Sequence, residues 1–345
     1  MYHNSGLVNV LVFGGGYDTD KDEATIRSND DEGNVIFIVN ATTGALVQKI
    51  SNTTPNVDGM NYAIASDVLP FDINRNGILD RIYAADVGGQ IIRIDIPETN
   101  EGSLSGGVIA DMSGDTESTF RRFFNTPEIG YYNRNGIQYF AILIGSGNHT
   151  LPLETAVTDN FFMIKDRNVW ARPETYTAVA FDDLYDATDN LVQDGDADQR
   201  STAANSMNTM PGWRIALENG AEKTFSRAVL YNYAVLFTTY SATRPDSQDP
   251  CESQGASGVS RFYAINMTNG AAMFGKLGGE NDTLNKDDRS KILSINAIPP
   301  TPSLLFPGND GGRLGSVIKA MVGLEEVTEW PMQLIPITWE EVINE

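Results

Sequence analysis

Nine residues, DINRNGILD at positions 72–80, carry oxygen-bearing side chains at a spacing that could bind a metal ion. Asp72, Asn74 and Asn76 alternate along the chain and Asp80 closes the segment. Ca²⁺ is a hard cation that takes about six to eight oxygen ligands. The spacing matches positions 1, 3, 5 and 9 of the EF-hand loop, where a glycine makes the sharp turn and a main-chain carbonyl serves at position 7. We therefore predict a Ca²⁺ site whose ligands are Asp72, Asn74, Asn76, the carbonyl of Ile78, and Asp80.

The segment is not a complete EF-hand. Its twelfth position is Tyr83 instead of glutamate, and no helix is expected on either side, so the pattern favours a calcium loop carried on a β-hairpin. Only two of the predicted ligands are full carboxylates, and lower ligand charge weakens binding. We therefore expect an affinity in the roughly micromolar to millimolar range.

The chain contains an internal control for this loop. The segment YYNRNGIQY at 131–139 aligns with 72–80 without a gap and keeps the Asn-Arg-Asn-Gly-Ile core, but Tyr131 and Tyr139 replace the two aspartates. Asn-Gly favours a tight turn between strands, so the core alone suffices for a hairpin. The aspartates are what distinguishes the first segment. A plain turn with incidental acids remains the alternative for 72–80.

Two other acidic segments place aspartates at alternate positions. They are predicted to be solvated loops, with a metal site as the alternative: Asp18, Asp20 and Asp22, and Asp194, Asp196 and Asp198. The glycine-rich GGGYDT at 14–19 follows a strand but opens no helix, so a phosphate site is not expected there. Cys251 is expected to be a free surface thiol or to pair with a cysteine outside this chain.

Composition narrows the function classes. The 345 residues include 24 basic and 46 acidic side chains, a net charge of −22, which opposes binding to nucleic acid. No apolar run is long enough for a membrane-spanning helix. The start, MYHNSGLVNV, has no signal-peptide pattern, which predicts a cytosolic protein, a mature product or a fragment. One cysteine and two histidines argue against zinc clusters and histidine-dependent catalysis, but they leave open a hydrolase that uses carboxylates alone. The protein is expected not to be an enzyme.

Short segments rich in β-branched and aromatic residues recur between turn residues, which predicts strands. They lie at 7–13, 34–40, 80–86, 90–96, 139–145, 160–166, 227–240 and 261–266. No long amphipathic helix is expected. The weak helical candidates are DNFFMIKDR at 159–167 and WEEVINE at 339–345.

A strand-turn-strand pattern repeats along the chain. GNVIFIVNATTGALV from Gly33 is repeated as VSRFYAINMTNGAAMF from Val259 and more loosely from Gly88. Repeated hairpins predict a β-propeller, whose blades take roughly 40–50 residues each. The fold class is therefore all-β, a modified β-propeller. The chain holds about five blades of material, and whether they close a ring is left open.

These segments resemble the type IV pilus biogenesis proteins of the PilY/PilC type, in their C-terminal β-propeller domain. The resemblance rests on VFGGGYDTD, GNVIFIVNATTGALV, DINRNGILDRIYAADVGGQIIRIDI, RRFF, LIGSGN with DNFFMIKD, and SRFYAINMTNGA, in this order. It implies a seven-bladed modified propeller, of which this chain resembles the later blades. Residues 1–325 would form blades that include the calcium loop, and residues 326–345 a tail or closing segment.

The resemblance also implies a function. Members of this family act at or near the tip of a type IV pilus, where Ca²⁺ in the nine-residue loop controls pilus extension against retraction, and hence twitching motility and adhesion. The implied partners are minor pilins of the tip complex, with a host or abiotic surface as a further candidate. The implied location is the cell surface, the pilus tip, or the outer membrane or periplasm of a Gram-negative bacterium.

Two other functions stay open. The Asn-Ala-Thr-Thr-Gly hairpin also resembles quinoprotein dehydrogenases, which are propellers holding pyrroloquinoline quinone and calcium, although four irregularly spaced tryptophans and a single cysteine weigh against them. An integrin-like propeller that binds matrix or carbohydrate would use the loop as a structural staple. The sequence does not separate a calcium switch from a calcium staple.

Overall fold

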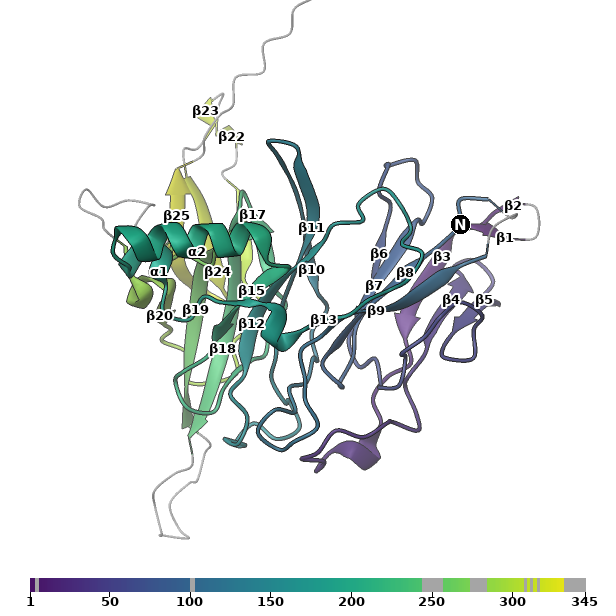
Figure 1. The fold of residues 1–345 in the computed structure, drawn as a ribbon, viewed down its shortest axis with the longest axis horizontal. Coiled ribbons are helices and arrows are strands. Elements are labelled where there is room, and N and C mark those ends of the chain that lie inside the picture. Colours follow the sequence, from purple (N-terminus) through teal and green to yellow (C-terminus); the bar gives the residue numbers. More distant parts are fainter. Residues whose placement is uncertain are drawn as a thin grey trace, which may run out of the picture.

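The structure is a computed structural model that is predominantly β (Figure 1). It describes residues 1–3, 6–99, 103–243, 257–273, 284–306, 309–310, 313–314 and 317–331. Within these ranges no helix is long and apolar enough to cross a membrane.

Five sheets follow one another along the chain. The first contains β3 (Val10–Gly14), β4 (Ile36–Asn40) and β5 (Leu46–Ile50). The second contains β6 (Leu69–Phe71), β7 (Arg81–Ala85), β8 (Gln90–Asp95), β9 (Ser105–Asp111) and β13 (Val179–Ala180). The third contains β10 (Glu128–Arg134), β11 (Ile137–Gly145), β12 (Asn160–Asp166), β14 (Tyr185–Asp186) and β15 (Gly212–Ala216).

The fourth sheet contains β16 (Glu222–Thr224), β17 (Val229–Tyr231), β18 (Ala234–Thr243), β19 (Ser257–Asn266) and β20 (Ser290–Ile292). The fifth contains β21 (Ser303–Leu305), β24 (Val317–Val322) and β25 (Glu325–Pro331). Two short pairs complete the strands: β1 (Tyr2–His3) with β2 (Gly6–Leu7), and β22 (Asn309–Asp310) with β23 (Arg313–Leu314). The helical elements are η1 (Thr19–Lys21), η2 (Phe181–Asp183), α1 (Leu191–Asp194), α2 (Ala197–Thr209) and η4 (Lys286–Arg289).

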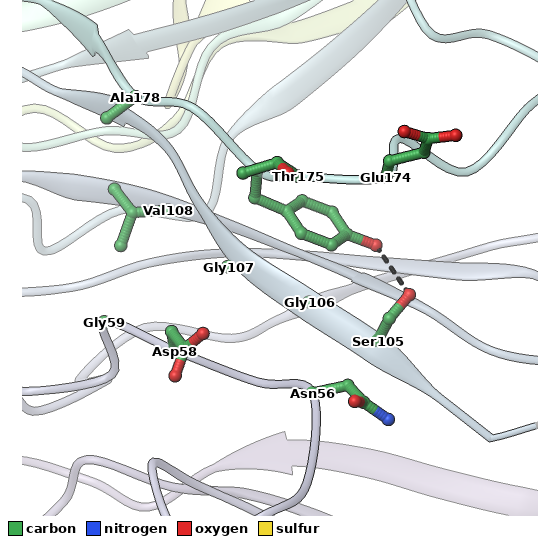
Figure 2. Close-up of a pocket in the computed structure, with 11 residues that line it drawn as sticks. Asn56, Asp58, Gly59, Ser105, Gly106, Gly107, Val108, Glu174, Thr175 and Ala178 are labelled. Atoms are coloured by element: carbon green, nitrogen blue, oxygen red, sulfur yellow. Dashed lines mark hydrogen bonds between the residues drawn. The ribbon is translucent and has the colours of Figure 1, made fainter.

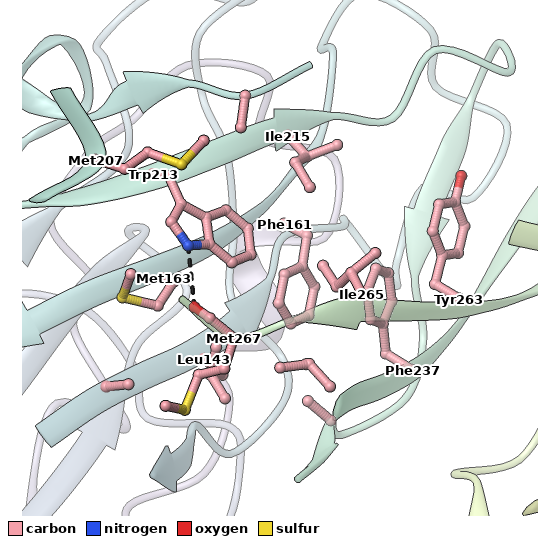
Figure 3. Packing of buried hydrophobic residues seen from close by; sticks show 14 of the residues in the cluster. Leu143, Phe161, Met163, Met207, Trp213, Ile215, Phe237, Tyr263, Ile265 and Met267 are labelled. Atoms are coloured by element: carbon pink, nitrogen blue, oxygen red, sulfur yellow. Dashed lines mark hydrogen bonds between the residues drawn. The ribbon is translucent and has the colours of Figure 1, made fainter. Parts of the chain in front are cut away.

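Each inner sheet is buried on both faces because side chains alternate along a strand. In β7, Ile82 and Ala84 pack with the first sheet, whereas Tyr83 and Ala85 pack with the third. The third and fourth sheets meet in the largest aromatic cluster (Figure 3). There the rings of Phe161 and Phe237 stack with centroids 4.0 Å apart. This stacking places successive sheets face to face, as neighbouring propeller blades are.

Figure 1 shows the sheets side by side in chain order, with β3–β5 at one end and β24 and β25 at the other. None of the described sheets closes into a barrel. The all-β expectation is therefore confirmed in its class, and the modified β-propeller stays a prediction. The domain boundary expected at residue 325 falls on the first residue of β25, and residues 332–345 lie outside the described ranges.

The strand predicted at 160–166 is confirmed, and the weak helical candidate that overlaps it at 159–167 was wrong. Residues 160–166 form β12 in the centre of the third sheet, because all seven of these side chains are buried between neighbouring sheets. Instead, α2 forms at 197–209, where no helix was expected. Asp196 caps it by accepting a hydrogen bond from the Gln199 N–H at 2.9 Å, and the Asp196 N–H donates in turn to Gln199 Oε1. The candidate at 339–345 lies outside the described residues.

The predicted repeat is confirmed at its turns. Asn40 and Asn266 each accept backbone hydrogen bonds two residues ahead, from Thr42 and Thr268. The glycine four residues after each asparagine has a positive φ, which glycine adopts without strain. The two hairpins therefore share one local structure although more than two hundred residues separate them.

Candidate metal centre

The predicted calcium loop connects β6 to β7. These strands pair from Leu69 with Tyr83 to Phe71 with Arg81, and the pairing stops there. The nine residues of the loop, 72–80, therefore leave the sheet at its edge and need other partners for their backbone N–H groups. Side-chain oxygens of the loop accept from the N–H groups of Ile73, Asn76, Gly77 and Ile78.

The oxygens of the loop point inward. Asp72 accepts from the N–H of Asn76 at 3.2 Å through Oδ1 and from Gly77 at 2.7 Å through Oδ2. Asn74 Oδ1 accepts from Asn76 at 3.0 Å, and Asn76 Oδ1 accepts from Ile78 at 2.8 Å. A carboxylate or amide oxygen has more than one lone pair, so each can still face a cation. The structure thus brings together the predicted side chains around one turn.

Asp80 is the buried member of the set, with 9% of its surface exposed. Its Oδ2 accepts from the Ile73 N–H at 2.7 Å, whereas its Oδ1 is buried and has no hydrogen-bond partner. Burial raises the pKa of Asp80, and the charges of Glu98 and Asp72 raise it further, against the Ile73 hydrogen bond. A buried carboxylate oxygen without a partner is costly unless something positive is placed beside it.

The residues present therefore fit a calcium ion. The donor set consists of hard oxygens, one of them buried and unused, which is what Ca²⁺ selects. Among the residues that the structure describes, no group of three or more His, Cys, Asp or Glu side chains is placed to hold a metal. That observation does not conflict with the loop, because the loop draws on amide and main-chain oxygens beside two carboxylates.

Sequence reasoning missed Glu98, which also reaches this loop. Its Oε1 accepts a hydrogen bond from Asn74 Nδ2 at 2.6 Å. The position follows from strand pairing: Arg81 is opposite Asp95, and the Ile96 N–H donates to the Asp80 carbonyl at 2.8 Å. Residues just after β8 therefore lie beside the end of the loop. Nothing in the linear spacing of 72–80 indicates this neighbour.

The internal control adopts a different backbone. In 131–139 the strands β10 and β11 remain paired up to Arg134 with Ile137, which leaves a two-residue Asn135-Gly136 turn. Both turn residues have positive φ, at 53° and 78°, as a type I′ turn requires. In the calcium loop the positive φ values fall on Arg75 and Gly77 instead. The same five-residue core thus makes a tight hairpin without the aspartates and an open oxygen-lined loop with them.

A buried ion network lies directly behind the loop. Arg81 donates to Asp95 Oδ1 at 2.8 Å, and Arg93 binds both Asp95 and Asp166. Tyr83 adds a hydrogen bond to Asp166 at 2.6 Å. Two arginines and two aspartates balance in charge, so the network is neutral and well satisfied, as buried charges must be.

The same network holds the segment 167–178, which we call the strap. Arg81 donates to the carbonyls of Asn168 and Val169, and Arg93 to the carbonyl of Ala171 at 2.9 Å. On its outer side, Trp170 donates to Gln138 of the second hairpin at 3.3 Å. The strap therefore contacts both the residues that follow the calcium loop and the control hairpin.

The other acidic candidates have structural roles in the described part of the chain. Asp18 caps η1 by accepting from the Asp20 N–H at 3.1 Å, and also accepts from Asp31. Asp196 caps α2, as above, and Asp194 accepts from the Lys286 N–H at 2.8 Å. Glycines 14–16 lead into η1, a single 3-10 turn, so no long helix follows them. Cys251 lies outside the described residues.

A pocket of about 480 Å³ lies between β9 and the strap (Figure 2). Asp58 and Glu174 contribute carboxylates to it, and Ser105 and Tyr176 contribute hydroxyls. Tyr176 donates to Asp95 at 2.6 Å and shares a 2.9 Å hydrogen bond with Ser105, so these hydroxyls serve the ion network. No buried polar side-chain atom that lines this pocket in the described structure lacks a partner, in contrast to Asp80. The calcium loop is therefore the stronger candidate site.

Comparison with known proteins supports the fold. No protein-family model matches the chain, and no curated protein matches it. Among solved structures, the chain is similar to the crystal structure of the Pseudomonas aeruginosa PilY1 C-terminal domain, with a TM-score of 0.58 and 14% sequence identity. The match covers 94% of this chain and 69% of that one. Identity this low supports a PilY1-like fold and no more.

Proposed function

We propose that this chain is a calcium-binding, non-enzymatic part of a type IV pilus-associated protein, at the cell surface or in the periplasm. The observation that carries the calcium proposal is the Asp80 Oδ1 atom, buried without a partner in a loop whose other oxygens face inward. Pilus association is supported by the PilY1-like fold over 94% of the chain.

The residues that would hold the ion are Asp72, Asn74, Asn76, Asp80 and the main-chain carbonyl of Ile78. When bound, Ca²⁺ would neutralise the carboxylates of Asp72 and Asp80 and would tie the two ends of the loop together. The chain's own contribution is to hold the oxygens in place through the backbone hydrogen bonds of the loop. Calcium binding would therefore change the net charge of the site as well as its shape.

A signal from the loop has a physical route to a protein surface. Asp80 is followed directly by Arg81, whose guanidinium holds the strap at Asn168 and Val169. The strap presents Trp170, which is 61% exposed. Ordering the loop would fix Arg81 and with it the strap, so a partner that contacts the strap would sense calcium. We propose minor pilins of the tip complex as that partner, and a host or abiotic surface as a second target.

The test is made in the bacterium that carries this gene. Asp80→Ala should abolish the response of surface piliation and twitching to added calcium, so that the variant behaves like the wild type in chelator. Glu117→Ala, which removes an exposed carboxylate outside the loop, is the matched control and should behave as wild type. An Asp80→Ala strain whose pili and motility follow calcium as the wild type does would overturn the proposal.

A further inference from the structure

We infer that Glu98 is a positioning residue beside the calcium site, outside its set of ligands, which both orients the Asn74 ligand and supplies nearby the negative charge that Asn74 lacks. This inference rests on the proposed function and goes beyond the nine-residue loop. It assigns to the site a positioning residue that lies outside the loop, just after the end of strand β8 in the sequence.

The orientation argument follows from hydrogen-bond chemistry. An ionised glutamate only accepts hydrogen bonds and a backbone N–H only donates them. Glu98 binds Asn74 Nδ2 at 2.6 Å, and the Asn76 N–H binds Asn74 Oδ1 at 3.0 Å. If the Asn74 amide were flipped, its NH₂ group would face the Asn76 N–H, donor against donor. Its oxygen would then face the Glu98 carboxylate, acceptor against acceptor. Glu98 therefore keeps the oxygen of Asn74, and not its NH₂ group, directed into the loop.

The charge argument follows from proximity. Glu98, Asn74 and Asp80 line one pocket of about 250 Å³, which also includes Trp170 and Arg172. A third negative group beside Asp72 and Asp80 strengthens the attraction for a divalent cation, because affinity rises with ligand charge.

The independent observation is the partnerless Asp80 Oδ1, which belongs to a side chain more than nine-tenths buried. Asp80 lines the same pocket as Glu98. Glu98 itself is exposed, so replacing it leaves the hydrophobic core intact. A change in calcium affinity on its replacement can therefore be separated from a loss of folding.

The experiment is a calcium titration of the whole chain by calorimetry. Replacing the hydrogen-bonding partner of a metal ligand typically weakens metal affinity about tenfold to a hundredfold, so we expect at least a tenfold loss in Glu98→Gln. Glu117→Gln makes the same charge change outside the loop and should bind as the wild type does. Asn74→Asp combined with Glu98→Gln should recover most of the affinity, because aspartate restores the charge and has no amide to turn. Melting temperatures in chelator should agree among all four proteins.

The outcomes separate the inference from the proposed function. If the wild type binds calcium, Asp80→Ala does not, and Glu98→Gln binds as tightly as Glu117→Gln, then the loop is a calcium site and Glu98 has no part in it. If Glu98→Gln is weakened but the double variant does not recover, charge and orientation do not account for the role of Glu98, and the inference is wrong. If the folded wild type binds no calcium, the proposed function itself fails.

Discussion

At the scale of single residues, Asp166 and Asp80 are both buried, but their surroundings suit them to different roles. All the acceptor capacity of Asp166 is engaged, by Arg93, the Tyr83 hydroxyl and the Asn168 N–H. Asp80 is buried to a similar extent but keeps one oxygen without a partner. The first aspartate balances charges that folding has buried, and the second remains available to an ion.

The role of Asp166 can be tested by removing its charge. Asp166→Asn leaves Arg81, Arg93 and Asp95 with an uncompensated positive charge in the interior. Breaking a buried ion pair from one side costs about 3–5 kcal/mol, so the free energy of unfolding should fall by about that much in chemical denaturation. Asp67→Asn, at an exposed position, is the control and should change it by less than about 0.5 kcal/mol. Equal stability of the two variants would show that the network is not a structural unit.

At the scale of elements, the two related hairpins show how two residues change the backbone of a shared core. Arg134 and Ile137 remain paired across a tight turn, whereas the corresponding Arg75 and Ile78 lie in an open loop. The sequence comparison identified the two aspartates as the difference between the segments, but it did not predict that their backbones would differ. It could not predict Glu98, whose position depends on the pairing of β7 with β8 rather than on spacing along the chain.

The turn glycines provide a matched pair of variants. Gly77 and Gly136 both have φ near 80°, and a Cβ at either would meet no atom within 4 Å, so alanine brings only backbone strain. Each Gly→Ala change should cost about 1–2 kcal/mol of unfolding free energy in chelator. Gly77→Ala should also weaken calcium binding, because strain in the loop displaces its ligands, whereas Gly136→Ala should leave it unchanged. Equal calcium affinity in both variants would contradict the assignment of the site to 72–80.

Helix α2 was missed for a physical reason. Only Ala203 and Met207 are buried on it, so it has no apolar stripe for a periodic pattern to reveal. Its ends are held instead by the Asp196–Gln199 capping box and by Lys165, which donates to the Met210 carbonyl at 3.0 Å. The capping box was readable in the sequence as Asp followed three residues later by Gln. The contact from Lys165 was not readable in the sequence, because Lys165 lies on strand β12, far from the helix along the chain.

At the scale of the whole molecule, strand patterns and repeated turns were enough to predict a succession of β-sheets built largely from hairpins, but not the parallel pairing of β13 with β9 and of β14 with β15. Their stacking order follows from the chain order and from strands with apolar residues on both faces, such as β7, β8 and β12. Ring closure was not predictable, because it depends on contacts between the first and last sheets rather than on any local pattern. The described sheets form a row in which the loop 72–80 follows β6, the edge strand of the second sheet.

The measurement that tests the account most directly is calorimetric calcium binding to the wild type and to Asp80→Ala, with folding of both confirmed in chelator. We predict one site in the wild type, with a dissociation constant in the roughly micromolar to millimolar range, and no site in Asp80→Ala. Calcium binding that persists unchanged in Asp80→Ala, or the absence of binding to the folded wild type, would contradict the assignment of residues 72–80 as a metal centre.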